Sequence, residues 1–254
     1  MPWKRVWESA SQKEYPYKIF MEVIRRIRDE GAVVYEHTDF PSTEDTISPE
    51  TWDWDYPGEP SKSELTVVKT DFYNDIKAYL ASLAENPMNL KGVEDIIEFN
   101  KKHAEEEGGL PGLHDAWPTG QDTFHHVAET RGIKDETYYS ALKYIRQKSR
   151  EEGIDAVLRS KGEPLDGILV PIQADSGTAN QLAAKAGYPV ITIPVAENKD
   201  DVPFGLAIVQ TSGREDLLIK YGSAIEDLIQ GRSPARFLNI DADNYMYVGV
   251  PPED

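Results

Sequence analysis

The chain has 254 residues and no cysteine, and its 45 Asp and Glu outnumber its 27 Lys and Arg to give a formal net charge of −18. Because phosphate recognition needs clustered Lys and Arg, this charge argues against a nucleic-acid partner. The lack of cysteine excludes a disulfide framework, a zinc–thiolate site and a cysteine nucleophile. No apolar run approaches the roughly 20 residues of a membrane span, and Met1-Pro2-Trp3-Lys4 does not open a signal peptide. We therefore expect a cytoplasmic protein without a membrane partner.

The length favours one domain over residues 1–254, and apolar side chains at three- and four-residue spacing predict many helices. In the first of these helices, over residues 15–30, the apolar stripe ends before Gly31, which can adopt positive φ and close the helix. Ala32–Tyr35 then reads as a short strand that could add an edge to a sheet. The expected helices cover residues 15–30, 65–84, 93–107, 121–131, 135–150, a short stretch around 157–158, and 214–230.

A long loop rich in Pro, Asp, Glu and Ser separates the first two helices, from Thr38 to Ser63. It contains Trp52-Asp53-Trp54-Asp55-Tyr56, which has the composition of a sugar-stacking platform with carboxylates. A surface loop held down by its aromatic side chains explains the same residues, and we favour it because long loops are often simply packed down.

Three short apolar runs bounded by Gly and Pro predict buried strands at Gly167–Val170, Val190–Val195 and Phe204–Gln210. A helix of small residues lies between the first two. This order predicts a strand–helix–strand crossover, and hence a parallel pair of strands with a right-handed connection. The expected fold class is α/β, with a mixed β-sheet core covered by helices.

The turn after the first strand carries the candidate site, because ligands of open α/β sheets bind at the carboxyl ends of strands. Its residues Asp175, Ser176, Gly177 and Thr178 are candidates for a polar pocket wall, and Asp175 is equally explained as a helix cap. Ser176 lacks the flanking glycines of a nucleophile elbow, and no histidine follows it to act as base.

No metal site or cofactor is expected. The pair His125-His126 is adjacent on a predicted helix, so the two side chains point about 100° apart and cannot share one metal ion.

The central stretch resembles the C-terminal part of the amidase signature family, nearest to its fungal general amidases. The segments that carry this resemblance are Val170-Pro171, the small-residue helix, Ala186-Gly187-Tyr188-Pro189-Val190-Ile191-Thr192-Ile193-Pro194, and Pro203-Phe204-Gly205-Leu206. The resemblance implies a partial amidase signature fold, hydrolysis of C–N amide bonds in a small substrate, and a cavity wall formed by Asp175, Ser176, Gly177 and Thr178.

Family members use a Ser–cis-Ser–Lys triad, yet this sequence contains no Ser-Ser dipeptide. We therefore expect no catalytic residue here, and a truncated amidase that meets its small amide substrate together with a missing N-terminal half. The alternative is a non-catalytic domain of the same fold that binds a ligand or partner.

Overall fold

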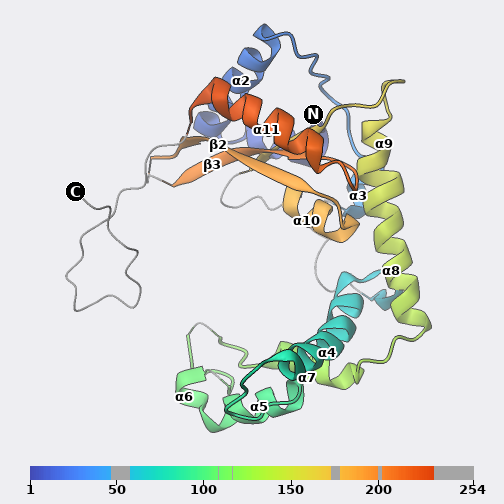
Figure 1. Cartoon of the computed structure of the whole chain (residues 1–254), viewed down its shortest axis with the longest axis vertical. Coiled ribbons are helices and arrows are strands. Elements are labelled where there is room, and N and C mark those ends of the chain that lie inside the picture. Colours follow the sequence, from blue (N-terminus) through green and yellow to red (C-terminus); the bar gives the residue numbers. More distant parts are fainter. Residues whose placement is uncertain (47–57, 108, 116, 173–177, 200–201, 232–254) are drawn as a thin grey trace, which may run out of the picture.

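The computed structural model describes residues 1–46, 58–107, 109–115, 117–172, 178–199 and 202–231. Figure 1 shows a small sheet with helices on both of its faces, joined by a long helix to a second group of helices. The elements in chain order are the turn η1 (Trp3–Trp7), α1 (Glu8–Ser11), α2 (Glu14–Asp29), α3 (Thr43–Thr46), η2 (Pro60–Lys62), α4 (Glu64–Ser82), α5 (Val93–Lys102), α6 (Ala104–Glu107), α7 (Asp122–Thr130), α8 (Glu136–Ser149), η3 (Arg150–Ile154), α9 (Asp155–Leu158), β1 (Ile168–Ile172), α10 (Thr178–Ala186), β2 (Val190–Glu197), β3 (Pro203–Val209) and α11 (Glu215–Ile229).

The three predicted strands form one sheet in the order β1-β3-β2. β3 is central and antiparallel to both neighbours: Ile168 lies opposite Val209 on one side, and Val190 lies opposite the same residue on the other. A register shift between Pro194 and Ala196 marks an irregularity near the end of β2. The α/β class and the single sheet are therefore confirmed.

The parallel pairing predicted for the first two strands is wrong. β1 and β2 do run in the same direction, but β3 lies between them, and every pairing among the described strands is antiparallel. The crossover through α10 thus skips one strand position, which the third apolar run then fills. Local apolar patterns identify strands but carry no information about which strand enters between two others.

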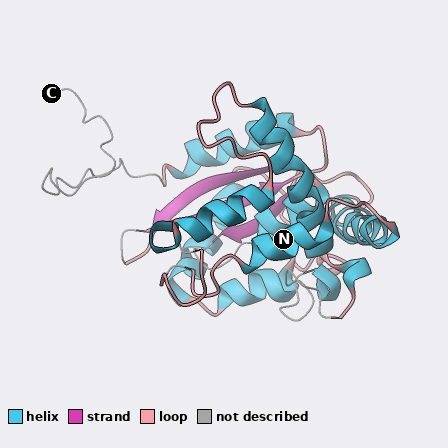
Figure 2. Cartoon of the chain, turned by 90° about the horizontal axis from the view of Figure 1, so that it is seen from below, coloured by secondary structure: helices cyan, strands magenta, loops and turns pink. Residues whose placement is uncertain are grey.

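Helices cover both faces of this sheet (Figures 1 and 2). α2 and α11 lie over one face and contact β2, while α10 lies on the other face against β1. Gly222 explains how closely α11 approaches, since a Cβ at this position would lie only 2.7 Å from Ile191 Cδ1. Gly31 ends α2 at φ +95°, with Ala32 N donating to Ile27 O, as its sequence position predicts.

The strand expected at Ala32–Tyr35 is not formed. These residues have no regular secondary structure, and Val33 is 75% exposed. An apolar run makes a strand only where a neighbouring strand accepts its hydrogen bonds, and none is adjacent to it in the described part of the chain.

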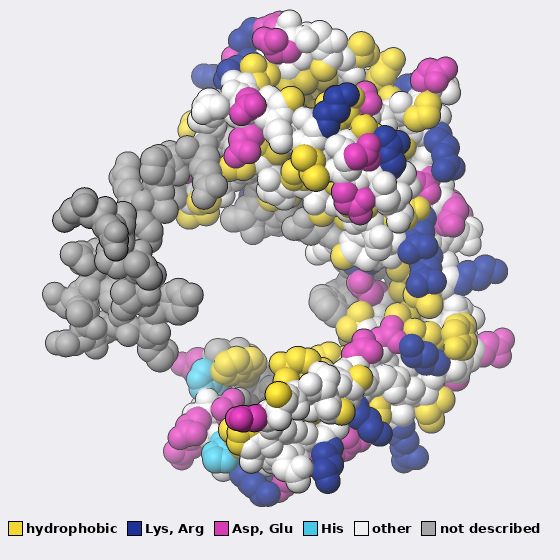
Figure 3. Space-filling model, in the orientation of Figure 1, with side chains coloured by type: hydrophobic (Ala, Val, Ile, Leu, Met, Phe, Trp, Pro, Cys, Tyr) yellow, Lys and Arg dark blue, Asp and Glu magenta, His cyan; other side chains and the backbone are white. Residues whose placement is uncertain are grey.

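The main hydrophobic core combines the two ends of the described chain. Its buried side chains come from residues 1–40 and 154–225, and among the described residues none comes from the segment between them. That segment forms the second group of helices, α4 to α7, which α8 joins to the sheet. Figure 3 shows a hollow between the two groups.

None of the described helices combines the length and the apolar character needed to cross a membrane. The aromatic cluster Trp52-Asp53-Trp54-Asp55-Tyr56 lies outside the described residues.

Candidate functional site

The predicted site turn connects the end of β1 to the start of α10. Ile172 ends the strand and Thr178 opens the helix. Asp175, Ser176 and Gly177 lie outside the described residues, as does the side chain of Thr178. Their role in a cavity wall therefore stays a prediction, and the structure fixes the two elements that the turn joins.

α10 is held firmly between the sheet and α8. Its small and apolar side chains Ala179, Leu182, Ala183 and Ala186 are each at most 2% exposed, and the helix contacts both β1 and α8. Side chains of this size allow close approach of the backbone on both sides, as the run of alanines suggests. The C-terminal boundary of the candidate turn is thus rigidly placed.

A buried ion pair connects α10 to the second group of helices. Lys185 Nζ lies 2.6 Å from a carboxylate oxygen of Glu64, the first residue of α4, and the Lys185 side chain is only 8% exposed. Burial lowers the pKa of Lys185, and the Glu64 carboxylate opposes that shift. This pair was not found from sequence, because the two residues are far apart in the chain and each occupies an ordinary helical position.

The Gly-Tyr-Pro motif has a structural role. Gly187 has φ +66° and reverses the chain between α10 and β2. The hydroxyl of Tyr188 donates to Asp155 Oδ2 at 2.8 Å, and the guanidinium of Arg150 lies over the Tyr188 ring and donates to Ala186 O at 2.5 Å. Burial, with the hydrogen bond to Asp155, raises the pKa of Tyr188. The motif thereby fastens the α10–β2 corner to η3 through Arg150 and to α9 through Asp155.

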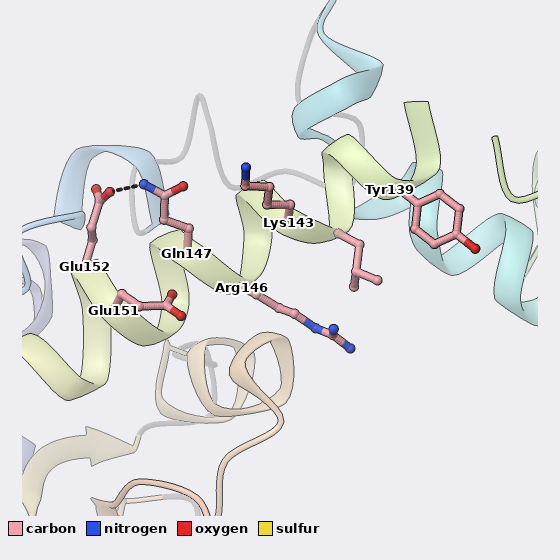
Figure 4. A pocket seen from close by; sticks show the side chains of 7 residues that line it. Tyr139, Lys143, Arg146, Gln147, Glu151 and Glu152 are labelled. Carbon is pink, nitrogen blue, oxygen red and sulfur yellow. Dashed lines mark hydrogen bonds between the residues drawn. The ribbon is translucent and has the colours of Figure 1, made fainter. Parts of the chain in front are cut away.

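A trough of about 590 Å³ runs along α8 and into η3 (Figure 4). Tyr139 and Arg146 project from the same side of the helix, seven residues apart, and Gln147 donates to Glu152 Oε1 at 2.6 Å. The Tyr139 side chain is 58% exposed. The lining residues are Tyr139, Leu142, Lys143, Arg146, Gln147, Glu151 and Glu152, which all belong to one continuous stretch of chain, so the trough has a single wall.

The trough combines apolar surface with two cations, Lys143 and Arg146, and two carboxylates, Glu151 and Glu152. Among the described residues, neither Lys143 nor Arg146 forms an ion pair. A guanidinium beside Leu142 and an aromatic ring suits a ligand that has a carboxylate and an apolar body. No group of three or more metal-ligating side chains occurs in the described part of the chain.

Comparison with known proteins places the chain among amidase-like sequences. No family model matches it. A protein of Schizosaccharomyces pombe that is provisionally named an amidase is 42% identical over 252 residues, which cover 96% of this chain and 42% of that protein. A protein of Arabidopsis thaliana, also provisionally named an amidase, is 27% identical over 215 residues, covering 85% of this chain and 37% of that protein.

The solved structures agree. The native peptide amidase from Stenotrophomonas maltophilia has a TM-score of 0.69 and 26% identity, over 89% of this chain and 42% of that chain. The expected resemblance is confirmed, and the chain spans about two fifths of the length of the relatives that it matches. Along nearly all of its own length, then, this chain resembles amidases in sequence and in fold.

Proposed function

We propose that this chain is one part of an amide hydrolase and corresponds to the C-terminal part of an amidase signature domain. It supplies sheet core and one wall of the cavity for a small amide, and the Ser–cis-Ser–Lys segment comes from a separate stretch of polypeptide. The observation that carries this proposal is the 42% identity over nearly the whole chain, combined with coverage of only 42% of that relative. The absence of a Ser-Ser dipeptide in the sequence supports it.

Within this proposal the turn formed by Asp175, Ser176, Gly177 and Thr178 lines the substrate cavity. Support comes from its position between the end of β1 and the start of α10. The ion pair between Lys185 and Glu64 and the packing of α10 hold that end of the turn in place.

The chain alone is expected not to hydrolyse acetamide or benzamide. Acyl transfer needs a nucleophile with a base in hydrogen-bond reach, and the sequence offers no such pair. The measurement is ammonia release by the purified chain, and by the chain mixed with the part of the S. pombe relative that it does not match. Turnover in the mixture alone supports the proposal, whereas turnover by the chain alone that Ser176→Ala abolishes contradicts it.

A non-catalytic binding protein is the second candidate, and the trough on α8 favours it. Benzoate, which has an aromatic ring and a carboxylate, is a probe that matches Leu142 and Arg146. In this case the mixture fails to hydrolyse amides, and calorimetry detects benzoate binding by the chain alone. Arg146→Ala should remove that binding, and Arg159→Ala, which changes an exposed arginine outside the trough, is the matched control.

A further inference from the structure

The outer edge of β1 is closed to another strand. In an antiparallel ladder the direct partners alternate between hydrogen-bonded and non-hydrogen-bonded pairs. Gln210 N donates to Pro189 O, which fixes this alternation for β3 and, through the register, for both of its neighbours. In β1 the residues whose backbone polar groups point away from β3 are therefore Leu169 and Pro171. The carbonyl of Leu169 already accepts from Trp7 Nε1 at 2.9 Å, and Pro171 has no N–H to offer.

The outer edge of β2 is open over a short length. By the same alternation, the backbone polar groups that point away from β3 are those of Val190, Thr192 and Pro194. The N–H and C=O groups of Val190 and Thr192 have no backbone partner on that side among the described residues. Pro194 contributes a carbonyl alone, and the register shift after it ends the regular edge. The free edge thus offers two donors and three acceptors.

One side chain beside this edge is exposed. Thr192 on β2 is exposed, although its partner Ala207 on β3 is fully buried and α10 contacts all three strands. An uncovered strand edge next to an uncovered side chain is what natural sheets avoid when nothing binds there.

We propose that the Val190–Pro194 edge is a strand-addition site, and that its occupant is an extended strand from the polypeptide that corresponds to the uncovered part of the relatives. This inference rests on the proposed function, which requires that second stretch. The same elements, in a fold with a TM-score of 0.69, form only 42% of the peptide amidase chain, so in that protein they are part of a body more than twice as long. With β1 closed by Trp7 and Pro171, β2 is the edge through which the sheet extends.

Residue-resolved amide exchange tests the site with an internal control. The N–H groups of Ile191 and Ile193 point toward β3 and should exchange slowly in every sample. Those of Val190 and Thr192 should exchange fast in the chain alone. Addition of the unmatched part of the S. pombe relative should slow both by about tenfold or more. The amide of Leu169, on the closed edge, should not change.

A pair of variants at one position separates the backbone from the side chain. Thr192→Pro removes the outward N–H without touching a bond to β3, so it should weaken complex formation by about tenfold, the worth of one hydrogen bond. Thr192→Val keeps that N–H and should bind as the parent does. The exchange experiment on the unaltered chain remains decisive even where Thr192→Pro folds poorly.

Several results overturn the inference. It fails if no complex forms, or if a complex forms while Val190 and Thr192 stay unprotected. It fails if they are already protected in the chain alone and lose protection on removal of residues 232–254, or if protection rises with chain concentration as a dimer forms. Amide hydrolysis measured in the same mixture separates the two ideas: protection without turnover overturns the proposed function alone, and turnover without protection overturns the strand site alone.

Discussion

Replacement of Trp7 by alanine is expected to lower the free energy of unfolding by about 3–5 kcal/mol, the usual cost of truncating a large buried aromatic side chain. Trp7 is 0% exposed, packs edge-on against Phe20 at 5.8 Å between ring centroids, and donates to Leu169 O. Since folded domains are stable by only about 5–15 kcal/mol, this loss is a large share of the total. Urea unfolding followed by far-UV circular dichroism measures it.

Trp117 provides the matched control, because it is 52% exposed and Trp117→Ala should change stability by no more than about 0.5 kcal/mol. The loss of stability caused by Trp7→Phe should lie between these two values. The lost hydrogen bond to Leu169 O accounts for roughly 1 kcal/mol of it, and the smaller ring adds the rest. Equal effects of the two alanine substitutions would show that Trp7 does not belong to the core.

The ion pair between Lys185 and Glu64 should respond unequally to removal of its two members. Glu64→Gln removes the carboxylate that lies 2.6 Å from the buried ammonium and should cost about 1–3 kcal/mol. Lys185→Met replaces the cation by an apolar chain of similar length and should be close to neutral or slightly stabilising. Thermal and urea unfolding of both variants test this asymmetry, and a larger loss for Lys185→Met would contradict it.

The same pair predicts a pH dependence. The pKa of Lys185 is lower in the folded protein, chiefly because of burial, than in the unfolded chain, where a lysine titrates near ~10.4. Between these two values the unfolded chain binds more protons, so this group makes stability rise with pH across that window. Lys185→Met should remove that rise, and an unchanged slope would show that other groups produce it.

Helices and strands were predictable here wherever the signal is local. The apolar stripe of α2 with Gly31 at its end is one case, and α8 is another, since Asp135 caps it by accepting from Tyr138 N at 3.0 Å. The helix expected over residues 93–107 is interrupted at His103, where the backbone leaves helical geometry between α5 and α6. Boundaries of this kind depend on neighbouring chain that periodicity does not contain.

Features that depend on distant residues were not predictable. The insertion of β3 between β1 and β2 is decided by pairing, and the fate of Ala32–Tyr35 by the lack of a strand to pair with it. Lys185 and Glu64 meet because two helices cross. The candidate turn was chosen from its polar composition after a strand, and that choice remains a prediction for Asp175, Ser176, Gly177 and Thr178.

The division of the main core between the two ends of the chain governs the order in which the protein can fold. Trp7 and Leu169 are separated by 162 residues, and Arg26 and its acceptor Leu228 by 202. Such distant contacts form late, because a long loop must close before they contribute. During synthesis at about 5–20 residues per second, roughly 10–40 s separate the emergence of α2 from that of its partners. α2 is therefore synthesised well before the residues that bury it, and its apolar stripe stays exposed throughout that interval.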